Sequence, residues 1–390
     1  MHVSRICSDL VRINSENPPG KTGDAIEYIR AFLEGLGIRS QVYGNGEGLD
    51  NLVAAKAGAP LLLAGHVDVV PASGQDWDRP PFSGEIAEGF VWGRGSTDMK
   101  GGCAAILSAC QSAADAGKEI PASLAFVCDE EEGGVYGMQY LLAKNLLAPC
   151  DCVIAEPTPA RHPTIGQKGL CRARFEFHGV PAHGSLYPAV GVSAIEEAAR
   201  FLAFMPVLHD TEYPVDDAMK EILSRSSDVL GQEFGIAKVR EVLPRLTYNP
   251  GRIQGGGKSN VVAQYCELEL EMRIPWGCVI SEVLDRMATR APQATITVNE
   301  SHAPSITDPK CPLVARTCRE IERVYGGPVF PIVQWAASDA RHLRKRGFSV
   351  LEYGPGEIAS LHAVNERVSV ESLEKSADVY GGLLREYAAL

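Results

Sequence analysis

The arrangement of apolar and polar residues predicts short buried strands that alternate with helices. Apolar runs with hardly a polar residue are typical of strands buried on both faces of a parallel sheet. One such run begins at Pro60, and three others occupy Leu124–Cys128, Cys152–Ala155 and Phe348–Leu351. Segments with helical spacing separate them, so the chain is expected to form a mostly parallel α/β sheet with right-handed crossovers.

The pattern changes after residue 168, where apolar and polar residues begin to alternate as in half-exposed strands. The order from there is a strand, a helix, two strands, a helix and a strand, with a helical insertion around Asp216–Leu243. This βαββαβ order predicts a compact α+β module. We therefore expect a discontinuous first domain, residues 1–168 and 301–390, and an inserted second domain, residues 169–300.

Several shorter segments also give predictions. Gln41–Ala55 is expected to form a hairpin with its turn at Gly44-Asn45-Gly46. The stretch QDWDRPPFSGEIAEGFVWGRG, which is rich in Gly and Pro, is expected to be irregular. The small residues of GGCAAILSACQSAADAG predict a helix that packs closely on the sheet. The GGGKS stretch, Gly255–Ser259, lacks the spacing of a phosphate-binding loop and precedes a strand pattern, so it is interpreted as a plain loop.

Composition and charge exclude several classes of protein. The 390 residues exceed what one hydrophobic core usually serves, and the net charge of −12 argues against nucleic acid or an anionic membrane as partner. No apolar run approaches the roughly 18 residues that span a bilayer, and the N-terminus has no signal-peptide pattern. The 11 cysteines form no metal-binding pairs and are expected to be reduced thiols in a cytoplasmic protein.

Histidines and carboxylates stand where the predicted strands end. Ligands collect at the carboxyl ends of parallel strands, so these side chains are expected to meet at one edge of the sheet. Imidazole and carboxylate ligands without thiolate suit zinc, cobalt or manganese, and two such ions can share one water. The candidates for a two-metal site are His66, Asp98, Glu130, Glu131, Glu156 and His362.

Each candidate also has a structural interpretation that residue spacing leaves open. Asp98 precedes a helix and could be its N-cap, and the Asp129–Glu132 run could be a solvated charge cluster. His183 could lie in a surface turn. Arg273 and Arg341 could bind a substrate carboxylate or form ordinary ion pairs.

Six motifs in order resemble the M20 family of metallopeptidases and amidohydrolases. They are GHVDVVP, GRGSTDMKGG, DEEEGG, AEPT, GVPAHGSLYP and LHAVNE, and they span almost the whole chain. The resemblance is to the branch with succinyl-diaminopimelate desuccinylase and acetylornithine deacetylase. It implies a zinc-peptidase catalytic domain and an inserted ferredoxin-like domain that serves as lid and dimer interface.

The resemblance also implies a ligand set for two divalent ions, most simply zinc. His66 would bind one ion and His362 the other, with Asp98 as the bridging carboxylate. Glu156 would complete the site of the His66 ion and Glu131 that of the His362 ion. The peptide bond between Asp98 and Met99 would be cis, as it is in the family.

Further roles follow from the same resemblance. Glu130 would be the general base and Asp68 the partner of the His66 ring, although Glu131 and Glu132 are an alternative base and ligand pair. His183 would reach the active site of the other subunit in a homodimer and stabilise the oxyanion. The residues implied to contact a substrate carboxylate are Asn260, Arg273 and Arg341.

The expected activity is hydrolysis of an amide bond that removes an N-acyl group from an amino acid or diamino acid. Gln167 and Lys168 stand where the desuccinylases tend to carry paired arginines, so the acyl group stays open. An M20-type carboxypeptidase or dipeptidase is the alternative within the family. An inactive metal-binding dimeric scaffold is the alternative outside enzymes.

Overall fold

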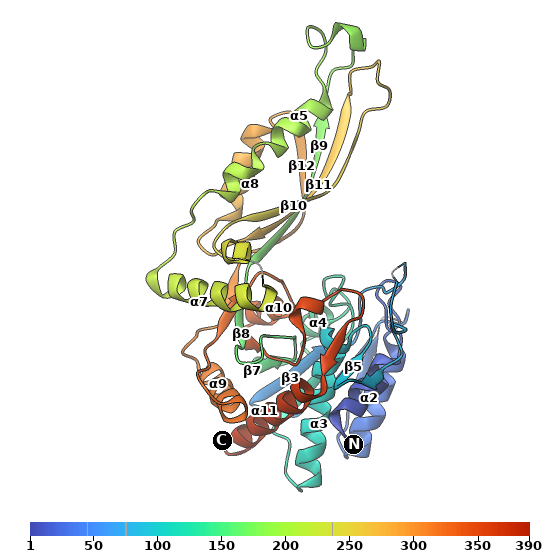
Figure 1. The fold of residues 1–390 in the computed structure, drawn as a ribbon, viewed down its shortest axis with the longest axis vertical. Helices are drawn as coiled ribbons and strands as arrows, with labels where there is room; N and C mark the ends of the chain where they lie inside the picture. Colours follow the sequence, from blue (N-terminus) through green and yellow to red (C-terminus); the bar gives the residue numbers. More distant parts are fainter. Residues whose placement is uncertain (45, 75, 236) are drawn as a thin grey trace.

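The chain folds into two connected bodies, one of which contains both termini (Figure 1). The structure is a computed structural model, and it describes residues 1–390 except Asn45, Gln75 and Ile236. The lower body in Figure 1 is built around a large sheet, and the upper, elongated body around a smaller one.

The large sheet has nine strands and forms the centre of the lower body. Its inner strands β6, β3, β7 and β15 are parallel neighbours, and antiparallel pairs lie toward both edges. This largely parallel sheet confirms the predicted fold class. From edge to edge the strands are β1 (Gln41–Gly44), β2 (Asp50–Ala54), β6 (Ala122–Val127), β3 (Leu61–His66), β7 (Asp151–Ile154), β15 (Ser349–Glu352), β8 (Thr164–Gln167) and β13 (Ser305–Ile306), with β14 (Ile332–Gln334) beside β8.

Strand β3 shows why the apolar runs are strands. All six of its residues are buried, because the sheet is covered on both faces. Full burial of a Leu side chain contributes roughly 1.5–3 kcal/mol, and three consecutive leucines open this strand. Its polar end, His66, therefore lies at the carboxyl edge of the sheet, beside the ends of β6 and β7.

Helices cover the sheet, and three of them, α1, α3 and α11, pack on one another. The helices of the lower body are α1 (Val3–Val11), α2 (Gly23–Gly35), α3 (Gly101–Asp115), α4 (Met138–Ala143), α9 (Pro312–Tyr325), α10 (Ala340–Lys345) and α11 (Val370–Ala388). The small residues of α3 allow the close packing that the sequence predicted. A Cβ added at Gly102 would lie 2.1 Å from the main-chain oxygen of Ala155, just beyond β7.

The upper body confirms the predicted βαββαβ order. Its antiparallel sheet runs β10 (Thr247–Gly255), β11 (Tyr265–Ile274), β9 (Gly169–His178) and β12 (Ala294–His302). Helices α5 (Ala194–Leu202) and α8 (Ile280–Arg290) supply Phe201 and Met287 to a core that also contains Phe175 and Phe177 of β9. A separate hydrophobic cluster in each body is typical of two units of folding.

The helical insertion packs mainly with the lower body, although its sequence lies between strands of the upper one. It comprises α7 (Asp217–Phe234) and a short 3₁₀ segment, Ala237–Glu241. The preceding helix α6 (Met205–His209) belongs to the upper body, because its Met205 and Leu208 lie in that core. Leu223 and Leu230 of α7 belong to the core of the large sheet. The main-chain N–H of Val333 in β14 donates to Ser226 Oγ of α7 at 2.9 Å.

The segment expected to be irregular contains two strands, which corrects that prediction. Strands β4 (Glu85–Ala87) and β5 (Phe90–Trp92) form a hairpin, and β16 (Arg367–Ser369) joins them as a third strand. Glu88 and Gly89 have φ of 55° and 81°, and positive φ at both positions is the requirement of a tight two-residue hairpin turn. Gln75, at the start of that segment, lies outside the described residues.

The predicted hairpin at Gln41–Ala55 is confirmed by the antiparallel pair β1 and β2. Its turn was expected at Gly44-Asn45-Gly46, and Asn45 lies outside the described residues. Gly44 pairs with Asp50, so the connection is longer than a two-residue turn.

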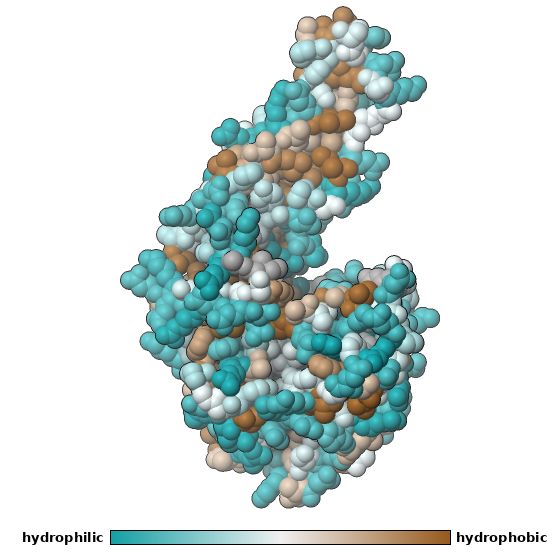
Figure 2. Space-filling model, in the orientation of Figure 1, coloured by the Kyte–Doolittle hydropathy of each residue, from teal (hydrophilic) through white to brown (hydrophobic). Residues whose placement is uncertain are grey.

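A deep notch separates the two bodies on the side shown in Figure 2. The carboxyl ends of the parallel strands point toward the upper body in Figure 1, so they lie beneath this notch. Within the described residues, no helix combines the length and the apolar character that crossing a bilayer requires. All 11 cysteines are free, as the sequence predicted.

The tight contact at Gly102 gives a first test of the fold. Gly102→Ala should lower the free energy of unfolding by about 1–3 kcal/mol, because the new methyl group has no space beside Ala155. Urea unfolding followed by circular dichroism measures it. Gly35→Ala in α2 is the matched control, since nothing lies within 4 Å of its added Cβ, and it should be neutral or stabilising by up to about 1 kcal/mol. Equal stability of the two variants would contradict the packing described.

Candidate metal centre

Five of the predicted ligands meet at the carboxyl edge of the large sheet. His66 ends β3, Glu156 follows β7 and Glu131 follows β6. Asp98 lies in the turn Ser96–Lys100 just before α3, and His362 lies in the loop between β15 and β16. His66 therefore lies at a strand end and Glu156 just beyond one, whereas Glu131, Asp98 and His362 lie in irregular segments.

Asp98 lies between the other four groups. Its Oδ1 is 3.1 Å from His66 Nε2, and its Oδ2 is 3.2 Å from His362 Nε2. Glu156 Oε1 lies 3.9 Å from His66 Nε2, and Glu131 Oε2 lies 3.3 Å from His362 Nε2. The two oxygens of one carboxylate thus face two separate imidazole and carboxylate pairs, which is the arrangement of a bridging ligand.

These groups fit two metal ions. The ligand atoms of His66, Asp98 and Glu156 lie within 4.8 Å of one another, and so do those of Asp98, Glu131 and His362. Glu131 Oε1 is buried and has no hydrogen-bond partner among the described residues. A buried carboxylate oxygen without a donor is costly, and a cation beside it removes that cost. The donor set, nitrogen and oxygen without sulfur, suits a borderline divalent cation.

Burial and crowding shift the pKa values of these groups strongly. Burial raises the pKa of Glu156 well above its ordinary value, and the nearby Asp98 carboxylate raises it further. Burial by itself would lower the pKa of His66, but Asp68 and Asp98 outweigh it and raise that pKa well above 6.5. So many ionisable groups in one small volume need compensating positive charge, which divalent ions would supply.

Asp68 organises the acidic loop that follows β6. Its Oδ1 accepts a hydrogen bond from the main-chain N–H of Glu130, and its Oδ2 accepts one from that of Glu131, each at 3.2 Å. His66 Nδ1 lies 3.0 Å from the main-chain oxygen of Asp68 and 3.5 Å from its Oδ1. Asp68 therefore contacts the His66 ring mainly through its main-chain oxygen. Its carboxylate instead holds the backbone of Glu130 and Glu131.

The order of acids in the loop gives each a different environment. Glu131 faces His362, whereas Glu132 is exposed. Burial raises the pKa of Glu130 well above its ordinary value, while the charges of His66 and Arg341 act to lower it. Glu130 belongs to neither of the two candidate ligand groups found among the described residues.

His183 and Asn260 lie together, but at the outer tip of the upper body. The main-chain N–H of Gly184 donates to the main-chain oxygen of Asn260 at 2.8 Å, and His183 forms an isolated antiparallel β-bridge with Val261. His183 is exposed, and its Nδ1 lies 2.8 Å from Ser185 Oγ. The tip is formed by residues 179–193 and 256–264, at the far end of β9 from the large sheet (Figure 1). Within one chain, the fold does not bring these two residues to the metal ligands.

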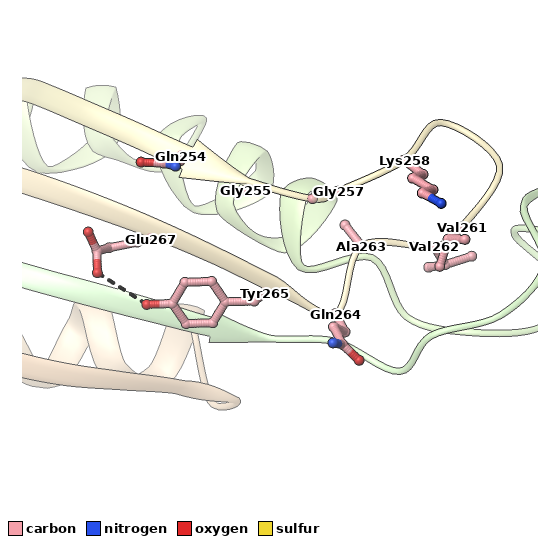
Figure 3. Close-up of a pocket in the computed structure, with 11 residues that line it drawn as sticks. Gln254, Gly255, Gly257, Lys258, Val261, Val262, Ala263, Gln264, Tyr265 and Glu267 are labelled. Atoms are coloured by element: carbon pink, nitrogen blue, oxygen red, sulfur yellow. Dashed lines mark hydrogen bonds between the residues drawn. The ribbon is translucent and has the colours of Figure 1, made fainter.

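A hollow of about 570 Å³ lies at this tip and contains none of the metal ligands. Figure 3 shows Lys258, Val261 and Val262 on the loop between β10 and β11, with Tyr265 and Glu267 farther down the sheet. Gly255–Gly257, from the GGGKS stretch, form part of its wall. Gly255 is the last residue of β10, and the rest of the stretch, 256–259, is a loop before β11, as the sequence predicted.

The two arginines expected to bind substrate differ in place. Arg273, near the end of β11, pairs with Glu271 at 2.8 Å. Arg341 is buried at the start of α10, where it donates to the main-chain oxygen of Ser338 at 2.8 Å and lies 3.8 Å from Glu300. Arg341 Nε has no partner among the described residues, so part of this guanidinium is unsatisfied beside the acidic loop.

Gln167 and Lys168 have structural contacts. Lys168 Nζ is buried and donates to the main-chain oxygens of Val242 and Arg245, at 2.7 and 2.6 Å. Gln167 Nε2 donates to Glu352 at 2.6 Å. Lys168 therefore connects the lower body to the segment that precedes β10, whereas Gln167 bonds within the lower body. Both side chains are already engaged by protein partners.

Two polar residues near the site, Asn17 and Glu366, had no role assigned from the sequence. Asn17 Nδ2 donates to Asp68 Oδ2 at 3.2 Å and to Asp129 Oδ1 at 3.0 Å. Glu366 accepts from the main-chain N–H of Asp98 at 3.1 Å. Asn17 lies after the first helix and in none of the six motifs, so no sequence pattern selected it. Glu366 is the last residue of the motif LHAVNE, which could have pointed to it. The Asp98-Met99 peptide bond is cis.

Comparison with known proteins gives one family. Residues 62–386 match the family described as Peptidase family M20/M25/M40. The succinyl-diaminopimelate desuccinylase of Sulfurovum sp. (strain NBC37-1) is 28% identical over 393 residues, which cover 97% of this chain and 97% of that protein. A desuccinylase of Cereibacter sphaeroides is 30% identical over 409 residues, with 98% of each chain covered.

Solved structures share the fold at lower identity. An M20 family metallo-carboxypeptidase from Sulfolobus solfataricus matches with a TM-score of 0.81 at 19% identity, and each chain is covered completely. A dinuclear metal-binding M20 peptidase of Bacillus subtilis matches with a TM-score of 0.67 at 13% identity, covering 98% of this chain and 96% of that one.

The hydrogen bonds of Asp68 give a test of the acidic loop. Asp68→Asn should weaken divalent-ion binding and kcat by about 10- to 100-fold, because an amide NH₂ group would face a main-chain N–H where a carboxylate oxygen now accepts. Metal titration of the chelator-treated protein measures the affinity. Asp308→Asn is the control, since that exposed carboxylate accepts from the Lys310 N–H at 2.9 Å. Unchanged metal affinity in Asp68→Asn would contradict the role given to its carboxylate.

Proposed function

Because this chain belongs to peptidase family M20/M25/M40 and is therefore a metal-dependent hydrolase of amide bonds, we propose that it removes an N-acyl group from an amino acid or diamino acid. Its relatives at 27–30% identity, aligned over nearly the full chain, are named succinyl-diaminopimelate desuccinylases. The observation that carries the proposal is the placement of Asp98, with one oxygen toward His66 and the other toward His362.

The residues that would hold two divalent ions, zinc in the first place, are His66, Asp98 and Glu156 for one and Asp98, Glu131 and His362 for the other. Cobalt or manganese would suit the same donors. When bound, the pair would lower the pKa of a shared water toward ~7 and polarise the amide carbonyl.

Glu130 would be the group that moves the proton. A carboxylate of raised pKa accepts a proton from the attacking water more readily near neutral pH than an ordinary one does. The same oxygen would then deliver that proton to the leaving nitrogen, so that the amine departs neutral. Asp68 would keep Glu130 in place through the main-chain hydrogen bond described above.

Arg341 is proposed as the anchor of the substrate carboxylate, with Arg273 and Asn260 as further contacts. Its unpartnered Nε and its place beside Glu130 support that role. A guanidinium can hold a carboxylate through two parallel hydrogen bonds, which would fix the amide relative to Glu130. Gln167 and Lys168 already bind protein groups, so they offer no free cation to a second carboxylate such as that of a succinyl group.

We propose that the protein is a homodimer in which residues 169–300, apart from α7, form the lid and dimer domain. Apolar side chains are exposed at the tip, where Val180 is 58%, Leu186 53% and Val190 51% accessible. Figure 2 shows apolar surface gathered there and over the body of this module. Exposed apolar groups of this kind often mark an interface. His183 would then enter the partner's site and donate to the developing oxyanion.

A carboxypeptidase or dipeptidase is the second candidate, supported by the fold shared with an M20 metallo-carboxypeptidase. Both activities would use the same metal centre and differ in what binds on either side of the amide. An inactive metal-binding scaffold is the third. We expect the protein to act in the cytoplasm, which its 11 free thiols support.

An activity screen would decide among these candidates. The chelator-treated protein, resupplied with zinc, cobalt or manganese, would be incubated with N-succinyl and N-acetyl amino and diamino acids and with dipeptides, and free amine would be measured. Turnover confined to N-acyl amino acids is expected. Turnover of dipeptides alone would favour the second candidate, and metal binding without any turnover would favour the scaffold.

The proposed base can be tested by one substitution. Glu130→Gln should lower kcat by about 10²- to 10⁴-fold, because glutamine cannot accept the proton. Its metal content, measured by plasma mass spectrometry, should stay that of the wild type. Glu132→Gln is the control, because that side chain is exposed. Loss of metal from Glu130→Gln would instead identify Glu130 as a ligand.

Mixed dimers would test whether His183 acts on the partner. His183→Ala alone should lower kcat by about 10²- to 10³-fold, as expected for loss of an oxyanion donor. When His183→Ala and Glu130→Gln subunits are coexpressed, half of the dimers should carry one intact site, which restores about a quarter of the activity. Mixing that restores none would mean that His183 does not act across the dimer.

A further inference from the structure

A buried ion pair joins the irregular segments that carry Asp98 and His362. Arg94 and Glu366 are each 1% exposed, and Arg94 Nη1 lies 2.7 Å from Glu366 Oε2. The residues are 272 positions apart in the chain. Arg94 precedes Asp98 on one segment, and Glu366 follows His362 on the other. The pair therefore acts as a link between two loops, separate from the strands of the sheet.

The Glu366 carboxylate is saturated by donors from the Asp98 segment. Its Oε1 accepts from the main-chain N–H groups of Thr97 and Asp98, at 2.9 and 3.1 Å. Its Oε2 accepts from Gly95 N–H at 3.0 Å as well as from Arg94. One side chain thus fixes the backbone of the turn up to the amide of Asp98.

Arg94 makes the reciprocal connection to the His362 segment. Its Nη2 donates to the main-chain oxygen of His362 at 3.4 Å, and its guanidinium carbon lies 5.1 Å from the centre of the Trp77 ring. Two further hydrogen bonds join the same segments: the main-chain N–H of Gly93 donates to Glu366 O at 2.8 Å, and the Thr97 hydroxyl Oγ1 donates to Arg367 O at 2.6 Å. The two loops are held as one unit.

The ligands differ in how much they need such a link. His66 and Glu156 stand at the ends of β3 and β7, which are neighbours in the sheet. Asp98 and His362 have no strand to hold them, and the His362 side chain is 52% exposed with φ of 58°. A buried ion pair generally gains little stability over a hydrophobic pair, so the contribution of this one is sought in the geometry that it imposes on the two loops.

We propose that Arg94 and Glu366 are positioning residues that set the separation of Asp98 and His362 and thereby the affinity of the ion held by Asp98, Glu131 and His362. The inference rests on the proposed function, since it assumes that this group binds a divalent ion. Neither residue touches the ion or the substrate. They act through the main chain on both sides of it.

In the experiment, the chelator-treated protein is titrated with zinc, and the heat of binding is measured by isothermal titration calorimetry. Glu366→Gln keeps the size of the side chain but replaces one acceptor oxygen with NH₂, which would face the Gly95 N–H and Arg94. We expect the wild type to bind two ions. The variant should bind the first about as the wild type does and the second about 10- to 100-fold more weakly.

A matched control separates positioning from the loss of any buried ion pair. Glu320 is 9% exposed and pairs with Arg323 at 2.7 Å on α9, which packs against α11. Glu320→Gln should lower thermal stability without changing either zinc affinity. Equal second-ion affinity in Glu366→Gln and Glu320→Gln would overturn the proposal.

A second variant keeps the test decisive if Glu366→Gln does not fold. Arg94→Lys retains the positive charge opposite Glu366 but removes the second guanidinium nitrogen, which donates to the main-chain oxygen of His362. This variant should fold. It should bind the first ion with the affinity of the wild type and the second ion more weakly. Second-ion affinity equal to that of the wild type would overturn the proposal. A wild type that binds no second ion would instead count against the proposed two-ion site itself.

Discussion

The crowding of carboxylates around His66 and His362 is the constraint on which the rest of this structure depends. Like charges at such short range repel, and burial removes the water that would screen them. Burial raises the pKa of Glu131 and of Glu156, and other carboxylates beside them raise it further. The fold can hold these groups together only because other elements fix each of them and because divalent cations can offset their charge.

The fold divides that task between two kinds of support. The parallel strands place His66 at the end of β3, paired with Val127 of β6, and they place Glu156 one residue beyond Ala155, whose N–H donates to Ala64 O. The acidic loop, the Asp98 turn and the His362 loop have no ladder and are held by buried side chains instead. Asp68 supports the first, and the pair of Arg94 and Glu366 supports the other two. Loss of such a side chain should therefore disturb the ligands more than it disturbs the sheet.

The upper body has a different relation to the metal centre. Its lower end contacts the large sheet through α7 and through Lys168, whereas its tip carries His183 and Asn260 far from the ligands. A single chain thus brings the candidate metal ligands together but leaves His183 and Asn260 apart from them. In the proposed homodimer, a second subunit would bring its tip residues to this centre, and the apolar side chains exposed at the tip would be covered in the same step.

The sequence by itself determined which segments are buried strands, which residues end them and which family the motifs resemble. These features are local, because burial on both faces of a strand leaves a continuous apolar run. Only the tertiary structure decided that Asp68 binds the acidic loop, that Glu366 supports Asp98, that α7 packs with the large sheet and that β16 joins β4 and β5. Each of those facts depends on the meeting of distant segments, and periodicity within one segment carries no information about which distant segment it will meet.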